Sequence, residues 1–240
     1  MAFHDIDLMV RTTAIAILNH VDRSGMLDDE KRRQVGLLVF DSESRVRKAV
    51  AGFFDGRWEE ERDEMLEEIQ GVERRKKKSQ PAGGRSKKNV DDEEDALVLK
   101  ARVGWKCLAA MFVRFSHALD DASAPLDADE TMDDPSAREA AEELKAWVEM
   151  APKGRIGSAV ESLWDKVDKL RDCEGLVEFL GLDHSAADDT DEDAETEGWK
   201  LDEDEEGCLI QVLVAGLRKL KADAEKKVSR PWPQKIVDPL

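Results

Sequence analysis

Helical periodicity is the feature that most constrains how this chain can fold. Apolar residues recur at three- and four-residue spacing wherever they occur, and no segment alternates polar and apolar residues long enough to predict a strand. The first stripe runs from Ile6 to Val21, and a second apolar helix carries Val46, Val50 and Phe53 towards Ile69. Further helices are expected at about 92–119, 135–150, 155–170, 173–181 and 202–226. The sequence therefore predicts an all-α fold.

An internal match at an offset of 36 residues narrows this prediction. The first segment is Asp5-(x)4-Val10-Arg11-(x)2-Ala14-(x)2-Ile17-Leu18, and the second is Asp41-(x)4-Val46-Arg47-(x)2-Val50-(x)2-Phe53-Phe54. Repeats of 20–50 residues made of helix pairs are typical of HEAT and armadillo solenoids. Chance likeness between two amphipathic helices is the alternative explanation of the apolar matches.

The repeat predicts particular contacts. We expect the Val10/Ala14/Ile17 and Val46/Val50/Phe53 faces to be buried between consecutive helix pairs of a HEAT-type α-solenoid. The repeated Asp either caps the second helix of its pair or bonds to the Arg of the neighbouring repeat.

Charge runs divide the chain into a solenoid segment over 1–226 and a C-terminal tail over 227–240. Within the segment we expect a flexible basic loop at 71–90 and acidic loops at 120–134 and 185–198. Such stretches repel themselves and bury little apolar surface, so they are predicted to be disordered.

Composition limits the function. The formal net charge of −18 excludes a protein that binds nucleic acid through its bulk charge, because that field repels phosphate. Three widely spaced cysteines, Cys107, Cys173 and Cys208, fit neither a disulfide framework nor a zinc site, and we expect buried, reduced thiols. No apolar run is long enough to span a membrane and no signal peptide is evident, so an intracellular protein is predicted.

Catalytic and cofactor motifs are not found in the sequence. The four histidines are scattered, and no Walker loop, G-x-S-x-G elbow or G-x-G-x-x-G loop occurs. The series Asp189, Asp191, Asp193 begins like a calcium loop, but Ala194 replaces the required Gly and Lys200 replaces the bidentate Glu. We therefore expect no enzyme, no cofactor, no metal site and no small-molecule substrate.

A basic segment is the sharpest local feature. Between Glu73 and Lys88 lie eight basic residues and one acidic residue. The candidate nucleic-acid-binding or nuclear-import residues are Arg74, Arg75, Lys76, Lys77, Lys78, Arg85, Lys87 and Lys88. Two basic clusters on a tether are typical of an import signal or of a phosphate-binding arm, and a solvated loop tip is the third interpretation.

Several blocks, in order along the chain, resemble the stromalin (stromal-antigen) subunit of cohesin in its fungal form. They are Asp7–Thr12, Leu38–Asp41, Arg45–Val50 with Phe53-Phe54, Gly154–Ile156, Ser162–Asp165, Leu170–Leu176, Leu182–His184 and the acidic lead into Leu209–Leu217. The family is also similar in placing a basic loop after the Phe-Phe helix. One departure is Cys173, where the family is expected to have Trp.

The resemblance implies an internal or truncated portion of a longer HEAT-repeat scaffold in the nucleus, on chromosomes. Such a scaffold binds the kleisin subunit of cohesin and, through it, the SMC subunits, and it contacts DNA in sister-chromatid cohesion. The alternative is a HEAT-repeat scaffold of another complex, either a condensin-type subunit or a nuclear transport adaptor.

Overall fold

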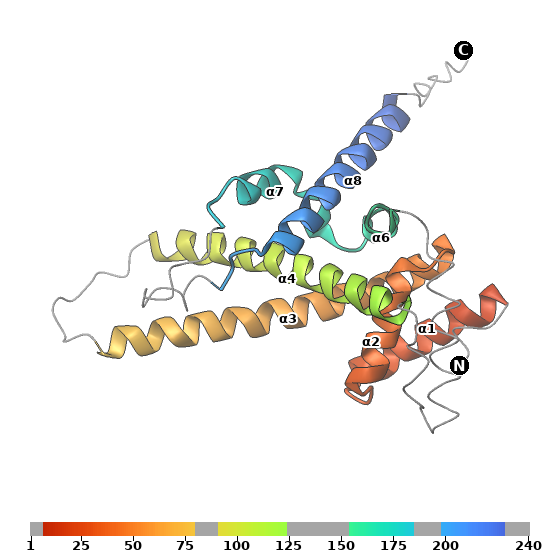
Figure 1. Cartoon of the computed structure of the whole chain (residues 1–240), viewed down its shortest axis with the longest axis horizontal. Helices are drawn as coiled ribbons and strands as arrows, with labels where there is room; N and C mark the ends of the chain where they lie inside the picture. Colours follow the sequence, from red (N-terminus) through yellow and green to blue (C-terminus); the bar gives the residue numbers. More distant parts are fainter. Residues whose placement is uncertain (1–6, 80–90, 124–153, 185–197, 229–240) are drawn as a thin grey trace, which may run out of the picture.

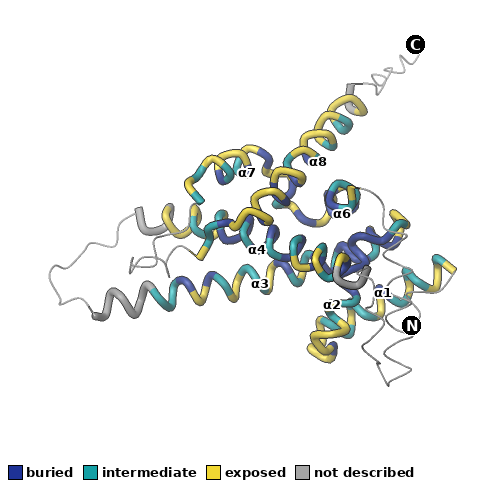
Figure 2. Tube along the Cα trace, viewed as in Figure 1, coloured by how far each residue is buried: buried dark blue, intermediate teal, exposed yellow. Residues whose placement is uncertain are grey.

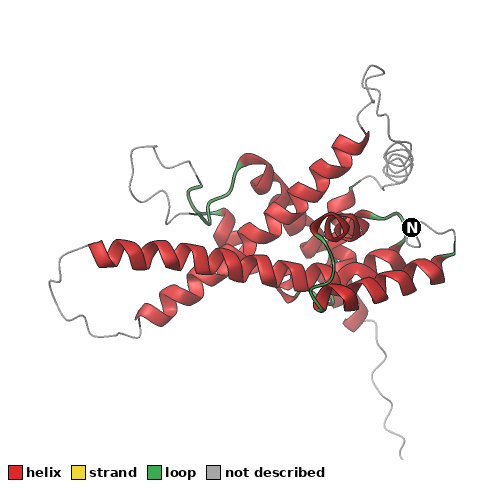
Figure 3. Cartoon of the chain, turned by 90° about the horizontal axis from the view of Figure 1, so that it is seen from below, coloured by secondary structure: helices red, strands yellow, loops and turns green. Residues whose placement is uncertain are grey.

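The computed structural model describes residues 7–79, 91–123, 154–184 and 198–228. These residues form helices joined by turns, and no strand occurs among them (Figure 3). The prediction of an all-α fold is confirmed for this part of the chain. The helix expected at 135–150 lies outside the described residues.

The first two helices begin at aspartate caps. Helix α1 (Leu8–Arg23) follows Asp7, whose side chain accepts a hydrogen bond from the Met9 amide, and α2 (Asp29–Leu37) follows Asp28 in the same manner. Between them Gly25 adopts a φ of +69°, which favours glycine. The short 3-10 helix η2 (Leu38–Phe40) is fully buried and leads the chain into the body.

Two long helices, α3 (Ser44–Ser79) and α4 (Asp91–Ser123), pack against each other in opposite directions and form the axis of the molecule (Figure 1). The Phe54 and Phe112 rings lie 5.2 Å apart at the centre of this contact. Trp58 Nε1 donates to the Gly104 carbonyl at 2.9 Å, which fixes the register of the two helices. A Cβ at Gly36 would lie 2.4 Å from the Phe115 ring, so α2 approaches α4 closely.

The remaining helices are α6 (Arg155–Leu163), η3 (Asp168–Arg171), α7 (Cys173–Leu180) and α8 (Glu203–Val228). Of these, α8 and α7 pack on α4, while α6 packs on α3 and α8 (Figure 1). The single helix expected at 155–170 is wrong, because the chain turns after Leu163 and Val167 is extended. This break allows both Val167 and Leu170 to enter the core.

The predicted basic loop at 71–90 is wrong for its first part, because α3 continues to Ser79. Glu, Arg and Lys are good helix formers, and the first proline comes at Pro81. A helix already nucleated by packing extends through such residues despite their like charge. Residues 80–90 lie outside the described part.

The first acidic loop and the tail are wrong at their first residues, which are helical. Helix α4 includes residues 120–123, and 124–134 lie outside the described residues. Of 185–198 only Gly198 is described, in a turn. Helix α8 reaches Val228, so 227–228 belong to it rather than to the tail.

The two halves of the internal match differ in burial. Val46, Val50 and Phe53 are at most 2% exposed, as predicted. The equivalent face of α1 is not a buried seam, because Val10 is 40% and Ile17 59% exposed (Figure 2). The reason is position: α3 is surrounded by α1, η2, α4 and α6, whereas α1 packs mainly against α3.

The three cysteines are free and buried, as the sequence predicts. Burial raises the pKa of the Cys107 and Cys208 thiols to about 12, since the thiolate form loses its hydration. Both side chains therefore behave as small apolar groups.

Candidate functional site

A buried polar network accounts for the Asp and Arg of the repeat. Asp41 is 1% exposed, and its carboxylate forms an ion pair with Arg11 of α1. Arg47 Nη1 donates to the Asp41 carbonyl at 2.6 Å, and its Nε donates to Ser162 Oγ of α6 at 3.1 Å. Asp41 Oδ1 also accepts from the Glu43 amide at 2.8 Å, at the start of α3. The predicted Asp–Arg bond between the two repeat segments is present, and the network is structural.

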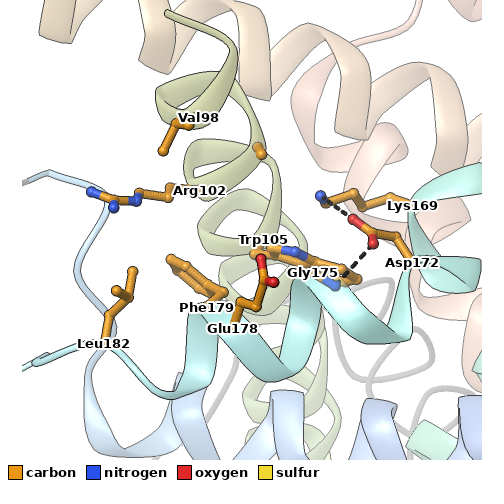
Figure 4. Close-up of a pocket in the computed structure, with 10 residues that line it drawn as sticks. Val98, Arg102, Trp105, Lys169, Asp172, Gly175, Glu178, Phe179 and Leu182 are labelled. Atoms are coloured by element: carbon orange, nitrogen blue, oxygen red, sulfur yellow. Dashed lines mark hydrogen bonds and ion pairs between the residues drawn. The ribbon is translucent and has the colours of Figure 1, made fainter. Parts of the chain in front are cut away.

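A groove between α4 and α7 is the best candidate for binding a partner (Figure 4). Its volume is about 240 Å³. Val98 and Ala101 line it from α4, and Phe179 lines it from α7, with Leu182 just beyond. These apolar walls are suited to an inserted aliphatic or aromatic side chain.

Trp105 of α4 lies deepest in the lining of this groove. It is 1% exposed, yet its Nε1 has no hydrogen-bond partner among the described residues. The Lys169 ammonium lies 4.4 Å from the centre of its ring, a favourable cation–π contact. An unsatisfied buried N–H carries a desolvation cost. This nitrogen has almost no accessible surface, so Trp105 contributes to the groove through its buried ring.

Charged groups of both signs border the groove. Lys169 forms an ion pair with Asp172 at 3.0 Å, and Asp172 in turn accepts from the Gly175 amide, also at 3.0 Å (Figure 4). Arg102 stacks 4.7 Å from the Trp199 ring centre. Among the described residues Arg102 and Glu178 form no ion pair, so each is available to a polar backbone or side chain of a partner.

An aromatic cluster fixes the far end of the groove. Phe179, His184 and Trp199 contact one another, with ring centres 5.0–6.2 Å apart. Leu201 N donates to His184 Nδ1 at 3.3 Å, so Nε2 carries the proton and donates to the Phe179 carbonyl at 2.9 Å. His184 therefore connects the end of α7 to the segment that enters α8.

The predicted basic residues are only partly located. Arg74, Arg75, Lys76, Lys77 and Lys78 lie on the last turns of α3, at the end of the long helix pair farthest from α1 (Figure 1). Arg85, Lys87 and Lys88 lie outside the described residues. The first cluster is thus presented on a helix rather than on a loop.

The sequence prediction missed the groove. Its residues come from α4, η3, α7 and the positions beside them. Asp172, Gly175 and Leu182 belong to blocks of the family resemblance, but no groove residue stands in a recognised binding motif. The only local signal is the pair Arg102 and Trp105, which share a helix face at a spacing of three. Only the packing of α7 on α4 brings that pair to the edge of a groove.

Within the described ranges, no group of three or more His, Cys, Asp or Glu side chains is arranged to hold a metal ion. The same residues include no helix that is both long and apolar enough to cross a bilayer. Comparison with known proteins gave no match: no protein-family model, no curated protein and no solved structure matches this chain.

Proposed function

We propose that this chain is part of a non-enzymatic, HEAT-type scaffold subunit of the cohesin stromalin kind, which binds the kleisin subunit and DNA. The observation that carries the proposal is the Arg47–Ser162 hydrogen bond, which joins residues 115 positions apart. Both belong to blocks on which the resemblance rests. Two sequence blocks that are far apart in the chain therefore pack into one helical body. This packing is expected if both blocks belong to a single scaffold subunit.

The groove between α4 and α7 is the proposed contact for an extended kleisin segment. An apolar side chain of that segment would insert between Val98 and Phe179, over the buried Trp105 ring. Arg102 and Glu178 at the border offer a donor and an acceptor to the rest of the backbone. A mixed border of this kind favours a peptide over a nucleic acid, because Glu178 and Asp172 repel phosphate.

Binding of the kleisin can be tested by filling the groove. Ala101 is exposed and lines the groove, so Ala101→Trp should occupy it without disturbing the core. Ala96→Trp, on the exposed opposite face of α4, is the matched control. In a pull-down with kleisin and SMC subunits, Ala101→Trp should lose at least tenfold in kleisin affinity while Ala96→Trp keeps it.

The outcome discriminates between the proposed partners. Capture of a condensin-type kleisin, or of a transport receptor, in place of the cohesin kleisin would favour the alternative scaffold. Failure to bind any kleisin would remove the proposed function. Equal binding by both tryptophan variants would place the kleisin on another face.

DNA contact is proposed for the basic segment that begins on the last turns of α3. Flexible Lys and Arg side chains engage phosphates without reading sequence. A segment that neutralises four or five phosphates gives a log K against log salt slope of roughly −4. Replacing Lys76, Lys77 and Lys78 with Glu should weaken duplex binding and flatten that slope.

Nuclear import gives a different result with the same triple variant: unchanged affinity for DNA and failure to reach the nucleus. If both DNA affinity and localisation survive the reversal, the basic segment is only a solvated tip, and both functional interpretations of it are wrong.

A further inference from the structure

Helix α8 exposes an apolar stripe that nothing in the described part of the chain covers. Ile210, Val214, Leu217 and Leu220 are between 40% and 51% exposed. The opposite face of the same helix is buried in the body through Cys208, Leu209 and Val212. The second half of α8 extends away from the other helices (Figures 1 and 2).

The spacing of this stripe is that of a coiled-coil seam. Alternating steps of three and four connect Gly207, Ile210, Val214, Leu217 and Lys221. All five except Gly207 are large side chains, and each of the five is exposed. A seam with this period packs against a second helix of the same period.

Charge along α8 is self-complementary in the antiparallel direction. Its first turn carries four consecutive acidic residues, Glu203 to Glu206. Its second half is basic, with Arg218, Lys219 and Lys221. Glu203 and Lys221 form no ion pair within the described residues, so both remain available to another helix. A parallel copy would bring like charges together, whereas an antiparallel copy pairs each acidic turn with a basic half.

We propose that α8 is a self-association surface, occupied by α8 of a second copy of this chain in antiparallel orientation. Each seam residue of one α8 then lies opposite a seam residue of the partner's α8. Ile210 packs on the partner's Val214, Leu217 packs over the partner's Gly207, and Lys221 meets the partner's Glu203. Each contact occurs twice about a two-fold axis, so the assembly closes as a dimer.

Charge reversal tests the pairing while leaving the fold intact, since Glu203 and Lys221 are exposed. Full-length chain at about 50 μM should sediment as a dimer, and Glu203→Lys or Lys221→Glu should each weaken the dimer at least tenfold. The double variant Glu203→Lys/Lys221→Glu restores the attraction with its sign exchanged and should return to within about threefold of wild type. Glu161→Lys, an exposed reversal on α6, is the control and should change nothing.

Disulfide trapping tests the direction. In the antiparallel dimer, a mixture of Ile210→Cys and Val214→Cys chains should form a cross-linked pair, while Ile210→Cys alone should not, because its two copies lie beyond the reach of a disulfide. Efficient cross-linking of Ile210→Cys alone would show a parallel pair and overturn the proposed geometry.

Other outcomes overturn the proposal itself. A wild-type chain that remains monomeric at about 50 μM has no such surface. A dimer that survives Leu217→Glu, with an unchanged circular dichroism spectrum, associates through another face. Neither result bears on kleisin binding, which uses the groove on α4 and α7.

Discussion

Helix α1 and the first half of α3 share a sequence pattern but not an environment. Val46, Val50 and Phe53 are almost fully buried, whereas their equivalents Val10 and Ile17 are 40% and 59% exposed. The polar positions differ in the same direction. Arg47 is 7% exposed and bonds to three groups, while the Arg11 side chain is 11% exposed and forms an ion pair with the Asp41 carboxylate.

The difference shows that a repeat pattern specifies a helix with an apolar stripe, not the number of neighbours that cover it. Each stripe is buried only as far as other elements surround it. Helix α3 lies among α1, α2, η2, α4 and α6, whereas α1 packs mainly against α3, so matched substitutions in the two helices should have unequal effects.

The largest contrast is expected at the aligned positions 53 and 17. Phe53→Ala should lower the free energy of unfolding by about 3–5 kcal/mol, because it removes a buried ring and leaves a cavity. Ile17→Ala removes a mostly exposed side chain and should cost no more than about 0.5 kcal/mol. Urea unfolding followed by circular dichroism measures both, and equal costs would mean that α1 is buried as deeply as α3.

The two repeat arginines should differ less. Arg47→Met leaves the Asp41 and Ser42 carbonyls and Ser162 Oγ without their donor, at a cost of about 3 kcal/mol. Arg11→Met removes one partner of the Asp41 carboxylate, which keeps its hydrogen bond from the Glu43 amide, so about 2 kcal/mol is expected. Thermal unfolding of the two variants at one pH would refute this order if Arg11→Met were the less stable.

The cap of α1 should contribute still less. Asp7 Oδ1 accepts from the Met9 amide at 2.8 Å, and Asp7→Ala should cost about 1 kcal/mol. Asp7→Asn keeps an acceptor and should recover most of the loss. Faster amide exchange confined to α1, with α3 unchanged, is the expected signature in hydrogen-exchange mass spectrometry.

Rates of thiol alkylation compare the buried contact of α3 with the exposed face of α1 without measuring stability. Cys107 lies on α4 against α3, and burial raises its pKa to about 12, so alkylation of the native chain at pH 8 should be slow. A thiol placed by Ile17→Cys on exposed α1 should react within minutes. The pKa of Cys107 is higher in the folded chain than its unfolded value near 9. The contribution of this thiol to the free energy of unfolding is therefore fully present below pH 9, and it decreases as the pH rises towards 12. A native Cys107 that reacts as fast as the α1 thiol would contradict the burial of this thiol between α4 and α3.

Several parts of the fold could be predicted because they depend on local rules. The helices at 92–119, 173–181 and 202–226 match α4, α7 and α8 within a few residues, since each has a periodic apolar stripe. The Asp–Arg bond between repeat segments was one of two roles that the matched spacing allowed, and Asp41 also accepts from the Glu43 amide. The break after Leu163 did not, because it depends on where the core accepts Val167 and Leu170.

The basic segment shows the reverse case, in which a predicted loop is helical. The run of positive charges predicted disorder from residue 71. Helix α3 nevertheless continues to Ser79, because these residues have high helix propensity and follow a helix that is already packed. The groove at Trp105 was not predictable, because Arg102, Lys169 and Phe179 come from three elements. Their proximity is a property of how α7 and η3 pack on α4.

The sequence by itself determined the class of this protein: helices of given length and polarity, free apolar thiols, and a concentration of positive charge in an acidic chain. Those properties depend on spacing, propensity and composition, which act within a few residues. The tertiary structure alone decided which stripe is buried and which is exposed, and it left Trp105 Nε1 without an acceptor at a groove. Burial is a relation between elements, so identical patterns in α1 and α3 take different roles once their neighbours are set.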